Sequence, residues 1–418
     1  MAEQHGKTLV PQIRFAGFTD PWEQRKLSDL TDRVSIQSSD SDLPQVEYED
    51  IIPGEGTLNK DLRDKKGGKT GIKFYAGDVL YGKLRPYLMN WLYPQFNGVA
   101  VGDFWVLRAT ECDSSFLYRL VQTGSFQRLA NVSSGSKMPR ADWNLISQSF
   151  FAVPADHAEQ KAIAKGLAEL DTLITLHQRK YDKLCVLKKS MLDKMFPKGG
   201  SLYPEIRFAG FTDPWEQRKL GDVARRVTRK NENRDSDLPL TISAQYGLVD
   251  QRTFFNNQVA SKDMSGYFLL HKGEFAYNKS TSTDSPWGAI KRLEKYDMGC
   301  VSTLYICFEL LSGDPDFLVT YYETDRWYKA VQLIAAEGAR NHGLLNIAPD
   351  DFFETQICIP KRIDEQRQIG AFFDRLDSLI TLHQRKYCGV ASWMLGVALV
   401  RLGSESDGAF GEMKHVLR

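Results

Sequence analysis

The chain has 418 residues, a formal net charge of +1, 42% hydrophobic residues and 26% charged residues. This length exceeds that of a usual single domain, so we expect two or more hydrophobic cores, and the composition excludes a disordered chain. The net charge excludes a uniformly basic surface, so any site for nucleic acid must depend on local clusters of Lys and Arg.

Neither a membrane segment nor a metal site is indicated. The longest apolar segment without charges, residues 388–400, is too short to cross a bilayer, and no early basic stretch precedes an apolar run. The six cysteines form no CxxC pair and have no histidine at zinc spacing, which favours buried thiols over disulfides or a metal centre. We therefore expect a cytoplasmic protein.

Two long segments of the sequence occur twice. Residues 13–27, IRFAGFTDPWEQRKL, recur unchanged as residues 206–220, and LITLHQRKY at 173–181 recurs at 379–387. Identity at fixed offsets indicates an internal two-fold repeat. We expect the tryptophan of the first block to anchor the entry to each globular unit.

The repeats and their linker set the expected domain organisation. Repeat one covers about 11–197 and repeat two about 204–387, and the Pro- and Gly-containing residues 197–204 read as the hinge. The predicted divisions are a first globular domain, a central helix with the start of the linker, a second globular domain, and a C-terminal helix with a divergent tail. Their boundaries are 1–155, 156–198, 199–361 and 362–418.

A long helix is predicted over residues 159–195. Eight of ten positions spaced alternately by four and three residues are apolar or aromatic, which is typical of a coiled-coil seam. The seam positions are Ile163, Leu167, Leu170, Ile174, His177, Tyr181, Leu184, Lys188, Met191 and Met195. At 1.5 Å per residue the helix would span roughly 55 Å, which suits a spacer. A simple core or oligomerisation helix is the alternative, and the seam histidines are assigned no chemistry.

Between the shared ends, each repeat holds roughly 130 residues of dissimilar sequence. Short alternating runs at 77–85 and 104–108 in the first repeat, and at 273–279 and 301–308 in the second, predict strands of a twisted sheet. The fold class is therefore α+β, with two repeated mixed α/β domains separated by long helices.

Basic and polar loops are the candidate contacts to nucleic acid. Residues 60–85 hold eight basic and three acidic side chains interleaved with tyrosines, and polar loops at 133–140, 277–283 and 337–343 accompany them. Such mixtures suit phosphate contacts and hydrogen bonds to base edges, although a charge run is more often a solvated face. The candidate DNA-binding residues are Lys65, Lys66, Lys69, Tyr81, Lys83, Arg85, Ser136, Lys137, Arg140, Tyr277, Lys279, Ser280, Thr281, Arg340, Asn341 and His342.

No set of residues for catalysis is found. The sequence GGKT at 67–70 imitates the end of a phosphate-binding loop, but the first glycine of that motif would fall at Arg63. Nucleophile-elbow, zinc-protease and dinucleotide-binding motifs are missing too. We interpret the chain as a non-enzyme; the alternatives are a stand-alone nuclease or methyltransferase, and a coiled-coil scaffold that does not bind DNA.

The sequence resembles the specificity subunit of type I restriction-modification systems over about residues 11–387. The resemblance rests on the Pro-Trp-Glu entry at 21–23, the Gly-Asp and Gly-Glu turns at 77 and 273, and the Val-Pro…Glu-Gln helix start at 153–160 with its copy at 359–366. It implies two target-recognition domains held apart by antiparallel coiled-coil helices, each domain reading one half of a bipartite DNA site. It also implies two methylation subunits as partners and, through them, restriction subunits. By the same resemblance, S-adenosylmethionine, ATP and Mg²⁺ act in the partner subunits, so we expect no cofactor in this chain.

The sequence departs from the repeat after Tyr387. The second copy loses the lysine-rich face of the first, and Gly389 and Gly396 each weaken a helix by about 1 kcal/mol relative to Ala. Apolar residues are kept at seam positions 390, 394 and 397, so we expect the helix to persist.

Overall fold

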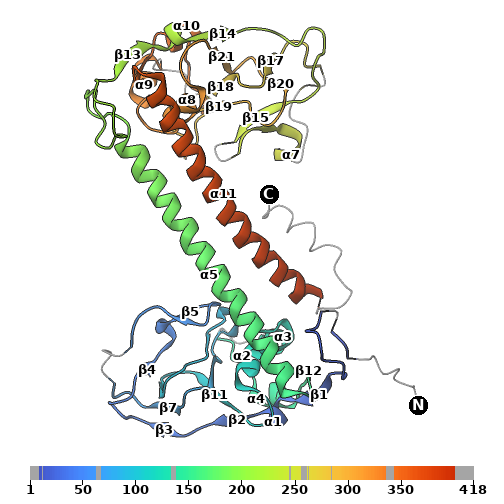
Figure 1. Ribbon diagram of the computed structural model, residues 1–418. Helices are drawn as coiled ribbons and strands as arrows, with labels where there is room; N and C mark the ends of the chain where they lie inside the picture. Colours follow the sequence, from blue (N-terminus) through green and yellow to red (C-terminus); the bar gives the residue numbers. More distant parts are fainter. Residues whose placement is uncertain are drawn as a thin grey trace. The chain divides into compact units, whose positions relative to one another are not determined.

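The computed structural model describes residues 9–11, 13–62, 67–132, 138–243, 246–255, 261, 263–283, 285–335 and 343–400, with side chains up to residue 386. The chain divides into two compact units (Figure 1). Unit 1 comprises Met1–Gln178 with Arg385–Arg418, and unit 2 comprises Arg179–Gln384. Each unit combines sheets with helices, as expected for the α+β class.

The described residues of unit 1 form two four-stranded sheets and two strand pairs. One sheet has the strand order β2-β11-β8-β9, all antiparallel; the other has the order β3-β7-β10-β4, in which β10 and β4 are parallel. The remaining pairs are β1-β12 and β5-β6. The elements are β1 (Glu23–Lys26), α1 (Leu27–Leu30), β2 (Thr31–Val34), β3 (Gln37–Ser38), β4 (Gln45–Val46), η1 (Tyr48–Asp50), β5 (Ile51–Ile52), β6 (Thr57–Leu58), β7 (Gly71–Phe74), β8 (Val79–Gly82), η2 (Pro86–Leu88), β9 (Trp91–Leu92), β10 (Gly98–Ala100), β11 (Phe104–Ala109), α2 (Ser114–Gln122), α3 (Gly124–Ala130), α4 (Trp143–Gln148) and β12 (Phe150–Val153).

Helices α2 and α3 begin at side-chain caps and bury one face. Asp113 and Thr123 accept hydrogen bonds from the backbone N–H groups three residues later, which satisfies donors left free at a helix start. The apolar side chains of both helices pack with Tyr81 and Trp105 of the sheet into one core. A second core lies around Phe74 and includes apolar residues from both four-stranded sheets.

Unit 2 repeats this plan. Its four-stranded sheet has the order β14-β21-β18-β19, which matches that of β2-β11-β8-β9, and three strand pairs complete it. The predicted run 301–308 is in fact divided by a turn between β20 and β21. The elements are β13 (Glu216–Lys219), α6 (Leu220–Val223), β14 (Ala224–Val227), β15 (Leu240–Ser243), β16 (Gly247–Asp250), α7 (Gln251–Phe255), β17 (Phe268–His271), β18 (Phe275–Asn278), β19 (Ala289–Arg292), β20 (Met298–Val301), β21 (Ile306–Leu310), α8 (Pro315–Tyr321), α9 (Tyr328–Ile334), α10 (Pro349–Phe353) and β22 (Gln356–Ile359).

Two helices of equal length follow the globular parts of the repeats. Helix α5 spans His157–Lys194 and α11 spans Ile363–Val400, each with 38 residues. The helix predicted over 159–195 is therefore confirmed to within two residues, and α11 persists through both glycines of the divergent tail. None of the helices in the described part of the chain has the length and apolarity to cross a membrane.

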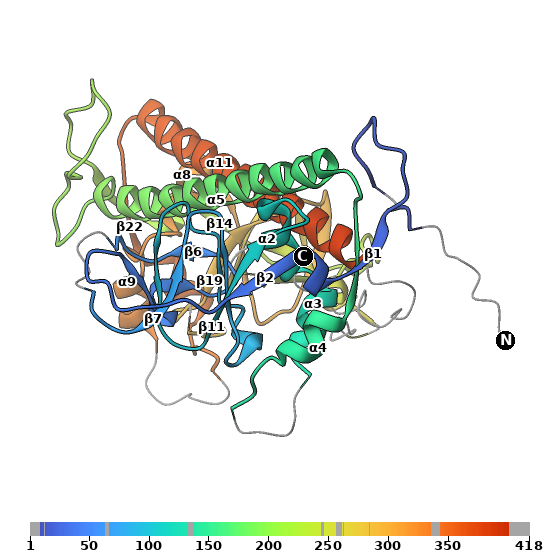
Figure 2. The same cartoon turned by 90° about the horizontal axis from the view of Figure 1, so that it is seen from below.

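Within unit 2, the last turns of α5 lie beside the first turns of α11 (Figures 1 and 2). Leu184 and Met191 of α5 pack against the core that contains Ile369, Phe373 and Leu376 of α11. Leu184 and Met191 occupy positions of the predicted seam. An antiparallel coiled coil over the full length of both helices stays a prediction.

Candidate nucleic-acid interface

A buried glutamate at the start of α5 fixes the entry segment of unit 1. Glu159 is 1% exposed and accepts two hydrogen bonds from the guanidinium of Arg14, both at 2.7 Å, and one from Trp22 Nε1 at 3.2 Å. A carboxylate with this many donors tolerates burial, and the N-terminus of a helix favours its negative charge. The entry segment is thereby attached to the first turn of α5.

Unit 2 contains the same anchor. Glu365 is also 1% exposed; it accepts bonds from Arg207 at 2.6 and 2.8 Å and from Trp215 Nε1 at 3.2 Å. The prediction that the tryptophan of the identical block anchors each unit is therefore confirmed. The identical sequence encodes the frame of each unit.

The glutamine after each anchor glutamate connects the long helix to two further parts of its unit. Gln160 donates from Nε2 to the carbonyl oxygen of Pro154 and accepts from the backbone N–H of Asp113, at 2.8 and 2.7 Å. Gln366 makes the corresponding two bonds in unit 2, both at 2.8 Å. The Glu-Gln pair thus joins the start of each long helix to the entry segment, to the end of the strand before it, and to the N-cap aspartate of α2 or α8.

Two of the predicted loops lie side by side in unit 1. Residues 83–85 pair with residues 139–141 through a backbone bridge between Leu84 and Arg140, with a 2.8 Å hydrogen bond on either side. We call these six residues the loop pair of unit 1. Loops that are distant in the sequence therefore place their predicted cations together, just after the end of β8.

One carboxylate pairs with two of these cations. Asp103 accepts from Arg140 at 3.0 Å and lies 3.5 Å from Lys83 Nζ. Partial burial would raise the pKa of Asp103, but the hydrogen bond from Arg140 and the two positive charges outweigh it, so its pKa is lowered. Lys83 and Arg140 keep 32% and 56% of their side chains exposed, and Arg85 is exposed too. The loop pair thus presents three cations around one carboxylate.

Unit 2 contains an equivalent loop pair, residues 279–281 with 343–345. A backbone bridge joins Ser280 to Leu344, with hydrogen bonds of 3.0 and 2.6 Å on either side. Lys279 donates to the carbonyl oxygen of Ile347 at 3.2 Å, and burial lowers the pKa of its ammonium group. Ser280 and Thr281 supply hydroxyl groups where unit 1 has Leu84 and Arg85, so the two pairs share backbone geometry and differ in chemistry.

An exposed apolar tip beside the loop pair of unit 1 was not among the predicted residues. Tyr87, Leu88 and Met89 are 54%, 40% and 43% exposed. Arg85, which precedes the tip, and Met89, its last residue, have φ values of 50° and 55°. These values lie in the left-handed region, which such residues adopt at a cost of about 1–3 kcal/mol. The signal in the sequence is Pro86, which starts the 3₁₀ turn that presents this tip.

Two predicted base-contacting residues belong to the core instead. Tyr81 is 1% exposed, stacks on Trp105 and donates to Gln127; Tyr277 is fully buried and donates to the carbonyl oxygen of Trp287. Neither ring has surface to offer a base, so both assignments are corrected. All four residues of β8 are buried, so Tyr81 is covered on either face of the strand, whereas the half-buried Lys83 lies just after the strand ends at Gly82.

Of the other predicted residues that the structure describes, Lys69 does not join a loop pair. Lys69 lies 2.7 Å from Glu47, whose hydrogen bond raises the pKa of the lysine, and its side chain is 66% exposed. Seven predicted residues lie outside the described part of the chain: Lys65, Lys66, Ser136, Lys137, Arg340, Asn341 and His342. Among the described residues, no group of three or more His, Cys, Asp or Glu side chains is arranged to hold a metal ion.

Comparison with known proteins gives a partial sequence match and a match in fold. The chain is 27% identical over 135 residues to the Type I restriction enzyme EcoDI specificity subunit of Escherichia coli, a match that spans 31% of this chain and only 30% of that relative. No protein-family model matches the chain.

Two solved structures align over nearly the whole chain. The S subunit of the type I restriction-modification system from M. genitalium is 11% identical, with a TM-score of 0.56 and coverage of 95% of this chain and 100% of that one. The HsdS subunit from Thermoanaerobacter tengcongensis is 16% identical, with a TM-score of 0.45 and coverage of 94% and 98%. The chain therefore has the fold of the S subunit from M. genitalium, at an identity that shows the fold alone.

Proposed function

We propose that this chain is the specificity subunit of a type I restriction-modification complex, and that each unit reads one half of a bipartite DNA site. The observation that carries the proposal is the duplicated loop pair: the same backbone bridge, in units that share the same Glu-Gln frame, presents different side chains. A shared frame with a variable loop pair is suited to reading two unlike sequences. The common fold with an S subunit supports the same assignment.

The chemistry of the loop pairs fits double-stranded DNA. In unit 1, Lys83, Arg85 and Arg140 would contact phosphates or guanine edges, and in unit 2 Ser280 and Thr281 would make hydrogen bonds to bases of either kind. Asp103 keeps Arg140 and Lys83 in place before DNA arrives. Because these cations lie in one cluster, a chain with a net charge of +1 still has a local basic surface.

In this proposal the chain supplies recognition and its partners supply chemistry. Helices α5 and α11 would space the two units and dock two methylation subunits, through which restriction subunits join the complex in the cytoplasm. S-adenosylmethionine, ATP and Mg²⁺ would be bound by those partners.

The test replaces residues 30–150 with the corresponding residues of an unrelated specificity subunit and expresses the chimera with its methylation subunits. Methylome sequencing should show that one half of the modified site changes and that the other half and the gap are kept. The reciprocal control replaces residues 223–355. A change in both halves after either single replacement would overturn the proposal, as would methylation that does not depend on this chain.

A further inference from the structure

The exposed tip of unit 1, residues 87–89, is fixed by backbone hydrogen bonds. The N–H of Met89 donates to the carbonyl oxygen of Pro86, and the carbonyl oxygen of Met89 accepts from the N–H of Gly54, both at 2.9 Å. Pro86 is buried, whereas the three side chains of the tip are exposed. The tip is therefore formed before any partner binds, so little conformational entropy is lost when one does.

The tip adjoins the cations of the loop pair of unit 1. Arg85 belongs to the loop pair and immediately precedes the 3₁₀ turn of the tip, and its N–H donates to the carbonyl oxygen of Pro139 at 2.8 Å. On the other loop, Met138 precedes this proline and is 50% exposed. Apolar and positively charged groups therefore share the surface around the loop pair. Such a surface is complementary to a polyanion that also exposes apolar groups, and duplex DNA has both properties.

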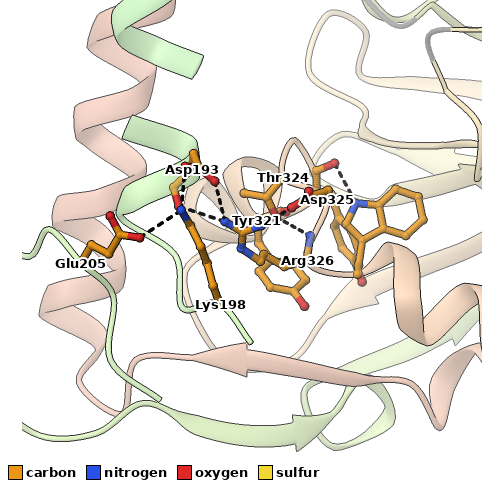
Figure 3. Close-up of polar contacts among 9 residues, drawn as sticks. Asp193, Lys198, Glu205, Tyr321, Thr324, Asp325 and Arg326 are labelled. Atoms are coloured by element: carbon orange, nitrogen blue, oxygen red, sulfur yellow. Dashed lines mark hydrogen bonds and ion pairs between the residues drawn. The ribbon is translucent and has the colours of Figure 1, made fainter. Parts of the chain in front are cut away.

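Arg85 differs from the cations that serve the fold. In unit 2, Arg326 donates to the backbone and side-chain oxygens of Asp193, at 2.9 and 3.1 Å (Figure 3). Lys198 pairs with the same aspartate and with Glu205, so these cations hold the end of α5 and the linker that follows. Arg85 is exposed and forms no ion pair with any residue that the structure describes. Its charge is available to a phosphate next to the tip.

The apolar tip identifies the group on DNA that it would contact. In the major groove, the base edges present hydrogen-bond donors and acceptors together with one kind of large apolar group, the 5-methyl group of thymine. We propose that Tyr87, Leu88 and Met89 read thymine by packing on this methyl group, in the half-site that unit 1 recognises. This inference rests on the proposed function and names the base that one of its two units requires.

Insertion between base pairs is the other way in which an apolar tip can bind DNA. A side chain that acts as such a wedge must project beyond its neighbours to separate two stacked bases. The three residues of the tip are only 40–54% exposed, so the protein covers about half of each. They present a face rather than a projecting side chain. A face suits contact with a methyl group on the groove wall.

Unit 2 has polar groups at the corresponding place. Its residues 279–288, between β18 and β19, correspond to residues 83–90 between β8 and β9, because the strand orders of the two sheets match. Trp287 in this segment packs against the core. The exposed side chains among the described residues of the segment are Ser280, Ser282, Thr283 and Pro286. The three-residue apolar tip therefore belongs to unit 1, and its effect should be confined to one half-site.

The test uses the full-length chain, assembled with its methylation subunits, and duplexes that carry the host's modified site. In the half assigned to unit 1 by exchange of residues 30–150, each thymine on either strand is replaced in turn by uracil. Uracil keeps the hydrogen-bonding groups of thymine and lacks only the 5-methyl group. At least one replacement should weaken binding by about fourfold, the effect of one methyl group that loses an apolar contact.

Variants of the tip connect this effect to its residues. With Tyr87, Leu88 and Met89 all changed to Ala, the same uracil should weaken binding by less than about twofold, because the contact is already absent. The effects of uracil in the other half should not change. Phe150→Ala, which removes another exposed apolar side chain of unit 1, should keep the full uracil effect. The single variants Leu88→Ala and Tyr87→Ala, with the uracil series on the unaltered chain, maintain the test if the triple variant does not fold.

Four outcomes would overturn the inference. The first is a half-site for unit 1 that contains only G·C pairs, and the second is a half-site whose thymines all tolerate uracil. The third is an equal uracil effect in the unaltered chain and the triple variant, which would place the methyl contact at other residues. The fourth is a triple variant that discriminates sites normally but loses its methylation subunits, which would assign the tip to a protein partner. Binding that does not distinguish the host's site from unrelated DNA would instead refute the proposed function.

Discussion

Lys188 donates to both carboxylate oxygens of Asp377, at 2.6 and 2.8 Å, and also lies 2.7 Å from Glu323. Burial alone would lower the pKa of Lys188, but the charges and hydrogen bonds of the two carboxylates outweigh it and the pKa is raised. Burial has the larger influence on Asp377, whose pKa is raised despite the lysine. The lysine of α5 thus neutralises carboxylates from α11 and from the segment after α8.

Replacing this lysine should destabilise unit 2. Lys188→Met would leave Asp377 and Glu323 facing one another without this cation, and we expect a loss of about 1–3 kcal/mol, since Asp377 is 45% exposed and partly screened. Urea unfolding followed by fluorescence measures the loss. Lys189→Met, on the exposed side of the helix, should cost less than about 0.5 kcal/mol. Equal effects of the two variants would contradict the role of the ion pair.

The same ion pair predicts a dependence on alkaline pH. The pKa of Lys188 is raised above its ordinary value of 10.5, so its contribution is complete below pH 10.5 and is lost as the pH rises through the folded-state pKa. The difference in free energy of unfolding between the unaltered chain and Lys188→Met should therefore be constant from about pH 7 to 10 and shrink above that. A difference in free energy of unfolding that grows as the pH rises would contradict this prediction.

The loop pair of unit 1 should account for a measurable part of the salt dependence of DNA binding. Changing Lys83, Arg85 and Arg140 to Gln should make the slope of log affinity against log salt shallower by about one for each phosphate that is no longer neutralised. Lys165→Gln, which removes an exposed cation of α5, should leave the slope unchanged. Fluorescence anisotropy with the host's modified site measures both. An unchanged slope in the triple variant would show that DNA binds at another part of the chain.

Tyr81 provides a test of the corrected assignment. Tyr81→Phe removes one hydrogen bond, to Gln127 at 3.3 Å, in the core of unit 1, and should lower stability by about 0.5–1.5 kcal/mol. Affinity for the site and discrimination against altered sites should not change. A loss of discrimination at full stability would restore the base-contacting role that the burial of this ring argues against.

The predicted spacer role of the helices is tested by a matched insertion. Seven residues added at equivalent positions of α5 and α11 keep the seam register and lengthen the spacer by about 10 Å, or roughly three base pairs. The modified site should keep both half sequences and have a longer gap, as read by methylome sequencing. Inserting four residues instead rotates the seam and should impair assembly. If a folded and active double insertion still modified sites with the original gap, the spacer role would be ruled out.

The sequence predicted the parts of the fold that depend on local patterns. The spacing of apolar residues gave α5 to within two residues, and the repeated Trp and Glu-Gln positions proved to be the frame contacts. The burial of Tyr81 could not be predicted in this way, because β8 is buried on both faces and therefore lacks the period-two alternation from which an inward position is read.

The strand pairs β1-β12 and β13-β22 have an evolutionary consequence. In each unit, four residues of the entry block lie in antiparallel register with the last strand before the long helix, from Glu23 opposite Val153 in unit 1 and from Glu216 opposite Ile359 in unit 2. The dissimilar interior of each repeat lies between these paired ends. A gene segment bounded by them could be exchanged by recombination within the shared blocks, provided that the new insert pairs with the shared strands and keeps the N–H that bonds to the frame glutamine. Under the proposed function, a host would thus acquire a new DNA address in a single genetic event.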